Sequence, residues 1–168
     1  MKYLITTIAA LVLVGCGTTQ PPEPPTAKAP DISIHEAARD GNIEAVKQHL
    51  ADGADVNARV NDGWTPMHFA IDYGRKEVAE LLISKGADVN AKDDGDGSLL
   101  HFATDSGYRE VAELLITKGA DVNAKRVDGE TPLDMAEEVF DHHTVEENAA
   151  KKETADILRK HGGKTGEE

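Results

Sequence analysis

A period of 33 residues constrains the fold of this chain more than any other feature. The hexapeptide GADVNA begins at three positions separated by that step: Gly53, Gly86 and Gly119. Other residues keep the same step: His35, His68, His101, Gly41, Gly74 and Gly107. A fixed period of this length indicates a solenoid, in which each unit buries its apolar face only against its neighbours. The sequence therefore predicts a stack of similar units from residue 31 onward.

Each unit has the signals of two short helices. In the segment TPMHFA (65–70), Thr65 is placed to cap a helix and Pro66 stands at its first helical position. Gly74 ends that helix. The next segment carries apolar residues at positions i, i+3 and i+4, which predict a second helix with one apolar stripe: Val78, Leu81 and Leu82. Gly86 closes this helix, and an extended turn leads to the next unit.

These motifs resemble the ankyrin repeat, whose pattern runs D-G-x-T-P-L-H-x-A, G, V-x-x-L-L and G-A-D-V-N-A. The resemblance spans residues 31–162 and divides them into units near 31–60, 61–93, 94–126 and 127–162. It implies an all-α fold, an ankyrin-repeat solenoid of about four helix-turn-helix units with extended connecting hairpin turns. It also implies that the three repeated histidines bond backbone and hydroxyl groups between turns.

Three units depart from the pattern. The first has ISIHEA at the helix start, as a capping unit would. In the third, Ser98 and Leu99 replace Thr and Pro, so we expect a weaker cap there, which Asp93 and Asp96 could replace. The fourth holds ten extra residues, which we place between its two helices near 139–149. The last residues, 163–168, should form a flexible tail.

The amino terminus has the features of an export signal. A basic residue, Lys2, precedes an apolar run over 4–14, which is too short for the roughly 20 residues that cross a bilayer. The following LVGC (13–16) resembles the lipobox of bacterial lipoproteins, which implies cleavage of the signal peptide 1–15 and lipid on Cys16. Residues 16–30 then form a Pro-rich, extended linker. Two alternatives stay open: a cleaved signal with a bystander thiol, and an uncleaved short anchor.

The same resemblance bears on location. Gly17 follows the cysteine where an Asp would suggest retention at the inner membrane. We therefore expect a lipid-anchored protein of the cell envelope, held at the outer membrane and facing the periplasm.

Charge and composition exclude several functions. The chain has 31 acidic and 18 basic residues and a net charge of −13. Such a surface repels nucleic-acid phosphates and favours a partner with a basic surface. A single cysteine cannot form an internal disulfide, and no nucleophile or phosphate-binding motif is present. We predict that the protein is not an enzyme and needs no cofactor.

The seven histidines are candidate metal ligands. Equivalent side chains of stacked helices lie about 8–10 Å apart, so the three repeated histidines cannot share one ion. The segment DHHTVEE (141–147) offers His142 and His143, although adjacent residues point in different directions on a helix. Our prediction is no metal site. The alternative is a metal-carrying or haem-carrying accessory protein that uses this inserted loop.

The remaining prediction is a protein-binding surface in the groove of the stack. In ankyrin proteins the binding residues precede the T-P-L-H element or the glycine that closes the first helix. The resemblance carries these roles to Arg39, Asp40, Asn61, Asp62, Trp64, Asp72, Tyr73, Asp94, Asp105, Ser106, Val127, Asp128 and Glu130. For Trp64, contact with a partner and packing along its own hairpin both stay open. The module would serve as an adaptor, for instance for a periplasmic enzyme of oxidative defence, or as an inhibitor, such as an immunity protein that neutralises a toxin.

Overall fold

The computed structural model describes residues 31–138 and 144–167. Within these ranges the fold is all-α, which confirms the predicted class. These ranges contain eight α-helices: α1 (Ile34–Asp40), α2 (Ile43–Ala51), α3 (Pro66–Asp72), α4 (Lys76–Ser84), α5 (Leu99–Asp105), α6 (Arg109–Thr117), α7 (Pro132–Glu137) and α8 (Val145–Lys160). One short 3-10 turn, η1 (Asn61–Gly63), lies between α2 and α3.

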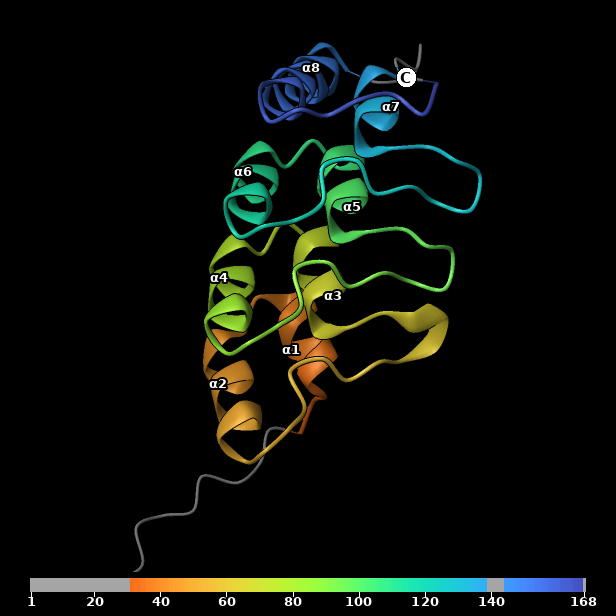
Figure 1. Ribbon diagram of the computed structural model, residues 1–168. Coiled ribbons are helices and arrows are strands. Elements are labelled where there is room, and N and C mark those ends of the chain that lie inside the picture. The colour runs from red at the N-terminus through yellow and green to blue at the C-terminus, as the bar shows by residue number, and fades with distance from the viewer. Residues whose placement is uncertain (1–30, 139–143, 168) are drawn as a thin grey trace, which may run out of the picture.

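The helices form pairs that stack on one another (Figure 1). Helices α1, α3, α5 and α7 make an inner row, in which each helix packs against the next. Helices α2, α4, α6 and α8 make a parallel outer row. Between the pairs, extended hairpins project from the same side of the stack. This arrangement presents the inner helices and the hairpins together on one surface.

The repeat period places equivalent side chains in the core. The outer helices of the second, third and fourth units each bury one leucine with no exposed surface: Leu82, Leu115 and Leu158. The inner helices bury alanines at equivalent positions: Ala37, Ala70, Ala103 and Ala136. Small residues let the inner helices approach closely, while the leucines fill the space between the two rows. The predicted stripe of α4 is confirmed at Val78 and Leu82, and Leu81 is half-buried.

The asparagine of each GADVNA motif links its unit to the next. The side-chain oxygen of Asn57 accepts a hydrogen bond from the backbone N–H of Asp88 at 2.9 Å, and Asn90 accepts one from Asp121 at 2.8 Å. The side-chain amides of both asparagines donate to the carbonyl of the glycine that opens the next motif. The motif therefore recurs because each copy supplies polar groups that its neighbour needs.

At position 74, between α3 and α4, the fold requires glycine. Its φ is +63°, a left-handed conformation that favours glycine. A Cβ at this position would also lie 2.8 Å from the ring of Tyr108 in the next unit. The turn thus needs glycine both for its backbone and for the packing of the following unit.

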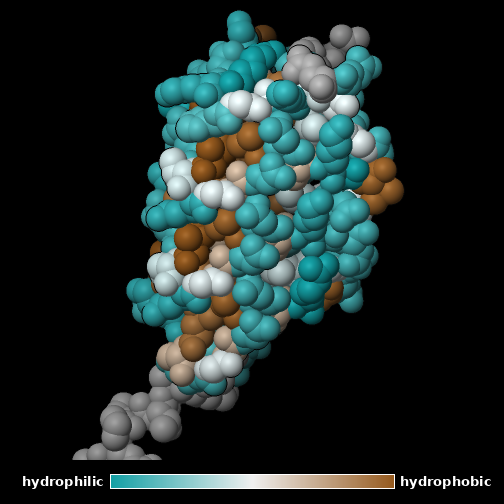
Figure 2. Space-filling model, in the orientation of Figure 1, coloured by the Kyte–Doolittle hydropathy of each residue, from teal (hydrophilic) through white to brown (hydrophobic). Residues whose placement is uncertain are grey.

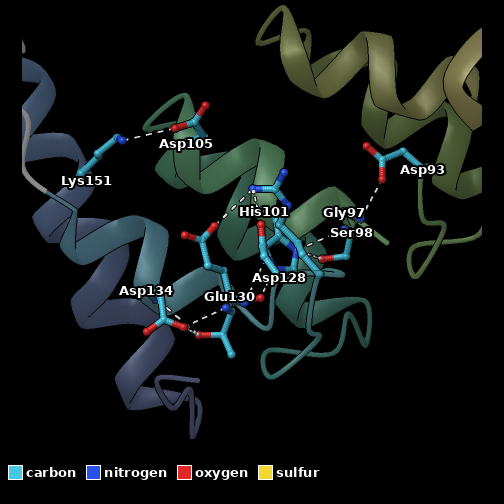
Figure 3. A network of polar contacts seen from close by, with 11 residues as sticks. Asp93, Gly97, Ser98, His101, Asp105, Asp128, Glu130, Asp134 and Lys151 are labelled. Carbon is cyan, nitrogen blue, oxygen red and sulfur yellow. Dashed lines mark hydrogen bonds and ion pairs between the residues drawn. The ribbon is translucent and has the colours of Figure 1, made fainter. Parts of the chain in front are cut away.

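Part of the insertion in the fourth unit is helical. Helix α8 has 16 residues, whereas α6, its equivalent in the third unit, has nine. The extra residues lengthen the start of α8 and bring Lys151 against the preceding unit. There the buried ammonium group of Lys151 lies 3.3 Å from the Asp105 carboxylate (Figure 3).

The end of the chain, which we expected to fray, makes specific hydrogen bonds through residue 166. The backbone N–H of Lys164 donates to the side-chain oxygen of Asn123, as Asp88 and Asp121 do to the earlier asparagines. The N–H of Gly166 donates to Asp134 at 2.8 Å. The segment therefore repeats the backbone path of GADVNA although its side chains differ.

In the part of the chain that the structure describes, no helix has the length and hydropathy to cross a membrane. The predicted signal peptide, Cys16, the Pro-rich linker, His142 and His143 lie outside the described residues.

Candidate functional site

Three half-buried apolar side chains line the exposed side of the inner helices. Phe69 on α3, Phe102 on α5 and Met135 on α7 occupy the same repeat position, one turn after the cap. We call these three residues the groove floor. In the first unit the equivalent residue is Glu36, which is exposed and belongs to the cap of α1. The apolar surface therefore begins at the second unit.

Trp64 packs beside this floor. Its indole lies edge-on to Phe69 and Phe102, with 5.1 Å between ring centroids in both pairs. It also stacks on His68 at 5.9 Å. The indole is half-buried by these rings from two successive units. Of the two roles left open for Trp64, packing within the stack is the one for which the geometry supplies contacts.

A row of carboxylates runs along the carboxyl ends of the inner helices. Asp72, Asp105 and Glu138 occupy one repeat position, and we call them the acidic row. Burial, with the nearby charge of Asp105, raises the pKa of Asp72 above its usual range. In the first unit this position is Arg39, which pairs with Asp40 at 2.9 Å. Tyr73, next to the row, has 48% of its surface exposed.

The hairpins bring a second set of predicted residues together. The backbone N–H of Asp94 donates to the carbonyl of Asp62 at 3.0 Å, and Val127 donates to Gly95 at 3.3 Å. The guanidinium of Arg59 reaches the Asp94 carboxylate at 3.2 Å. Successive hairpin tips are therefore tied to one another, which fixes the exposed side chains at their ends.

The predicted partner-binding residues thus lie in two bands. The hairpin band holds Asn61, Asp62, Trp64, Asp94, Val127, Asp128 and Glu130, and the helix-end band holds Arg39, Asp40, Asp72, Tyr73, Asp105 and Ser106. Between the bands lies the groove floor, which sequence reasoning missed. Its signal was available, because Phe69 and Phe102 follow two of the repeated histidines directly.

The repeated histidines are structural. In the second unit the Nδ1 atom of His68 accepts the backbone N–H of Thr65 at 3.1 Å and lies 2.9 Å from its hydroxyl. His101 makes the same contacts with Ser98, at 3.1 and 2.7 Å (Figure 3). Since Nδ1 accepts, Nε2 carries the proton, and that of His101 donates to the carbonyl of Glu130 at 3.1 Å. Among the described residues, no group of three or more His, Cys, Asp or Glu side chains could hold a metal ion.

The third unit keeps the capping contacts of the second although its residues differ. Ser98 and His101 form the same capping box as Thr65 and His68, so the hydrogen bonds of the cap persist with serine in place of threonine. Asp93 does not replace it. Its carboxylate accepts the backbone N–H groups of Gly95 and Gly97 at 2.9 and 2.7 Å and thereby closes the hairpin.

The fold and this surface define a helical-repeat solenoid with an apolar floor between two polar bands. The chain belongs to the ankyrin repeat family: residues 34–126 match the family described as Ankyrin repeats (3 copies). Ankyrin repeats are protein–protein interaction modules.

Segments of the chain are similar to parts of characterised proteins. Acyl-CoA-binding domain-containing protein 4 of Oryza sativa subsp. japonica is 45% identical over 47 residues, which are 28% of this chain and 14% of that protein. Protein phosphatase 1 regulatory subunit 27 of Mus musculus is 43% identical over 47 residues, 28% of this chain and 30% of the relative. Myotrophin of Xenopus tropicalis is 43% identical over 44 residues, 26% of this chain and 37% of the relative. The chain thus spans well under half of each of these relatives.

Proposed function

We propose that this protein is a membrane-tethered binding module that holds a partner protein in the surface formed by its inner helices and hairpins, without catalysis of its own. The observation that carries the proposal is the groove floor, which leaves Phe69, Phe102 and Met135 half-buried in register. A partly apolar surface bordered by polar groups is typical of a protein interface. The similar phosphatase subunit is named for a regulatory role, which agrees with binding rather than chemistry.

We further propose that the partner presents a basic surface. The chain has a net charge of −13, and the acidic row borders the groove floor. The surface is largely hydrophilic in the view of Figure 2, with apolar residues gathered in separate patches. Complementary charge of this kind accelerates encounter and is weakened by salt. Adaptor and inhibitor roles both fit such a surface.

The anchor is the second part of the proposal. The lipobox-like LVGC (13–16) supports lipid on Cys16, with the Pro-rich linker as a spacer and the periplasmic face of the outer membrane as the location. Several acyl chains are needed for stable membrane attachment, which this kind of modification supplies. Metabolic labelling with a palmitate analogue tests the anchor. We expect labelling of the wild-type chain and none of Cys16→Ser; equal labelling of both would refute it.

The binding surface is tested by a photo-crosslinking amino acid placed at two exposed positions of the second unit. Position 73 borders the acidic row, whereas Glu77 lies on the outer helix α4. In the cells that produce the protein, we expect a discrete cross-linked species from position 73 and not from position 77. Addition of Asp72→Asn should weaken it, and Glu77→Gln, which removes the same charge on the outer helix, should not. Cross-linking from position 77 alone would move the interface to the outer row.

A further inference from the structure

One repeat position of the hairpins is filled differently in each unit. Trp64, Gly97 and Glu130 are separated by 33 residues and each directly precedes the cap of an inner helix. In the second unit the indole of Trp64 covers the rings of Phe69 and Phe102. In the third unit Gly97 has no side chain with which to cover Phe102 and Met135.

A cavity of about 170 Å³ lies at this place between the third and fourth units. Phe102 and Met135 supply its apolar wall, and Gly97 leaves its hairpin side open. Its polar groups come from Asp93, His101, Asp105 and Arg126. Phe102 and Met135 thus form a wall equivalent to the pair Phe69 and Phe102 of the preceding unit. Trp64 packs on that earlier pair, whereas no aromatic ring from the third hairpin packs on this one.

The charges around the cavity favour a basic neighbour. Asp93 and Asp105 line the cavity. Asp72 lies close enough to Asp105 that the charge of Asp105 contributes to the raised pKa of Asp72. The cation of Arg126 is already held by Glu130 at 3.3 Å and Asp128 at 4.0 Å (Figure 3 shows this side of the unit). Asp105 is paired with Lys151 at 3.3 Å. Four carboxylates, those of Asp93, Asp105, Asp128 and Glu130, still exceed the two cations of Arg126 and Lys151, so complementary charge in a partner would be positive.

We propose that this cavity binds the side chain of a Trp or Tyr from the partner protein, in a segment whose flanking residues are Lys or Arg. The ring would lie on Phe102 and Met135 as Trp64 lies on Phe69 and Phe102. Its N–H or O–H would face the carboxylates of Asp93 and Asp105, which accept such donors. The flanking cations would face the acidic row. This inference rests on the proposed function and adds the chemistry of the partner.

The direct test uses blocked tripeptides and the full chain, with binding followed by NMR at the methyl group of Met135. Acetyl-Lys-Trp-Lys-amide should shift this signal in a saturable way. Acetyl-Lys-Ala-Lys-amide should bind about tenfold more weakly or not at all, because the ring is lost. Acetyl-Glu-Trp-Glu-amide should also bind more weakly, and added salt should reduce the difference.

Each peptide result bears on one part of the inference. Equal binding of a Lys-Leu-Lys peptide would overturn the requirement for an aromatic ring, and equal binding of Glu-Trp-Glu would overturn the requirement for basic flanks. No saturable shift with Lys-Trp-Lys would overturn the site. If cross-linking from position 73 persisted in that case, the proposed function would stand without this cavity. Loss of both would remove the two proposals together.

Filling the cavity from within provides the matched variants. Asp93→Val with Gly97→Trp gives the third hairpin the residues of the second, Val60 and Trp64. The Asp93 change is needed because a Cβ at position 97 would lie 2.9 Å from its carboxylate. Met135→Trp fills the same space from helix α7 and leaves the hairpin unchanged. Both variants should keep the helical circular dichroism and lose the Lys-Trp-Lys interaction. For these variants binding is measured by isothermal titration calorimetry, because Met135→Trp lacks the methyl group of Met135. Retained binding in a folded variant would place the peptide elsewhere.

Discussion

The second and third units of the stack have the same framework and different hairpins. Their inner helices each have seven residues and their outer helices nine, and Leu82 and Leu115 are completely buried in both. In the hairpins, however, Asp93 and Gly97 of the third unit stand where the second has Val60 and Trp64. Stacking thus dictates the helical positions, while the hairpin positions are free to differ and to define what the surface can bind.

The difference reaches the interior through one histidine. Nε2 of His101 donates to a backbone carbonyl, whereas Nε2 of His68 is buried without a hydrogen-bond partner among the described residues. Around His68 the polar partner is replaced by rings, with Trp64 stacked on it and Phe102 edge-on at 5.4 Å. The second unit therefore gives up a hydrogen bond where it gains aromatic packing.

The largest expected effect tests the shared framework. Leu82→Ala and Leu115→Ala should each lower the free energy of unfolding by about 2–5 kcal/mol, because each leaves a cavity in a fully packed core. Urea denaturation followed by circular dichroism measures both. The two values should agree within about 1 kcal/mol, and Leu81→Ala, at a half-buried position of α4, should cost less. A large difference between the two leucines would show that the units are not energetically equivalent.

The next largest expected effect is the pH dependence of stability that the two buried histidines cause. Burial lowers the pKa of His68 to about 4 and also lowers that of His101. Above pH 6.5 both histidines are neutral in the folded and the unfolded chain, so they do not change the free energy of unfolding. Below pH 6.5 the unfolded chain binds protons that the folded chain does not, so the free energy of unfolding falls as the pH decreases to about 4. For His68 the loss is about 3 kcal/mol when complete.

His68→Asn provides the measurement. We expect the variant to be less stable than the wild type at pH 7 and to show a flatter dependence of the urea midpoint between pH 6.5 and 4.5. His101→Asn is the matched control and should leave the His68 contribution in place. An unchanged pH dependence in His68→Asn would mean that this ring is not held neutral by the fold.

Much of the framework was predictable from sequence because its residues repeat in register. Thr65, Pro66 and Gly74 mark the limits of α3, and the GADVNA copies mark the turns. The contacts of the final segment were not predictable, since Lys164 uses only its backbone to continue the asparagine ladder. The length that the insertion adds to α8 was also not predicted, although the extra residues include good helix formers.

The binding surface was predictable only in part. The two polar bands follow from the family pattern, but the groove floor depends on which hairpin side chains cover it. Whether Phe102 is covered depends on Trp64 from the unit before and on Gly97 from its own unit. The contact of Trp64 with Phe102 joins side chains of two successive units and has no signature within a single repeat.

The smallest effect concerns the caps, where the two units should agree in spite of different residues. Thr65→Ala and Ser98→Ala should each lower the free energy of unfolding by about 1 kcal/mol, because each removes the hydroxyl of an equivalent capping box. Ser98→Thr keeps the hydroxyl and should change stability by less than about 0.5 kcal/mol. Urea denaturation of the three variants at pH 7 gives the comparison. If Ser98→Ala proved harmless while Thr65→Ala was costly, the third unit would hold its helix start by packing of Leu99 rather than by its cap.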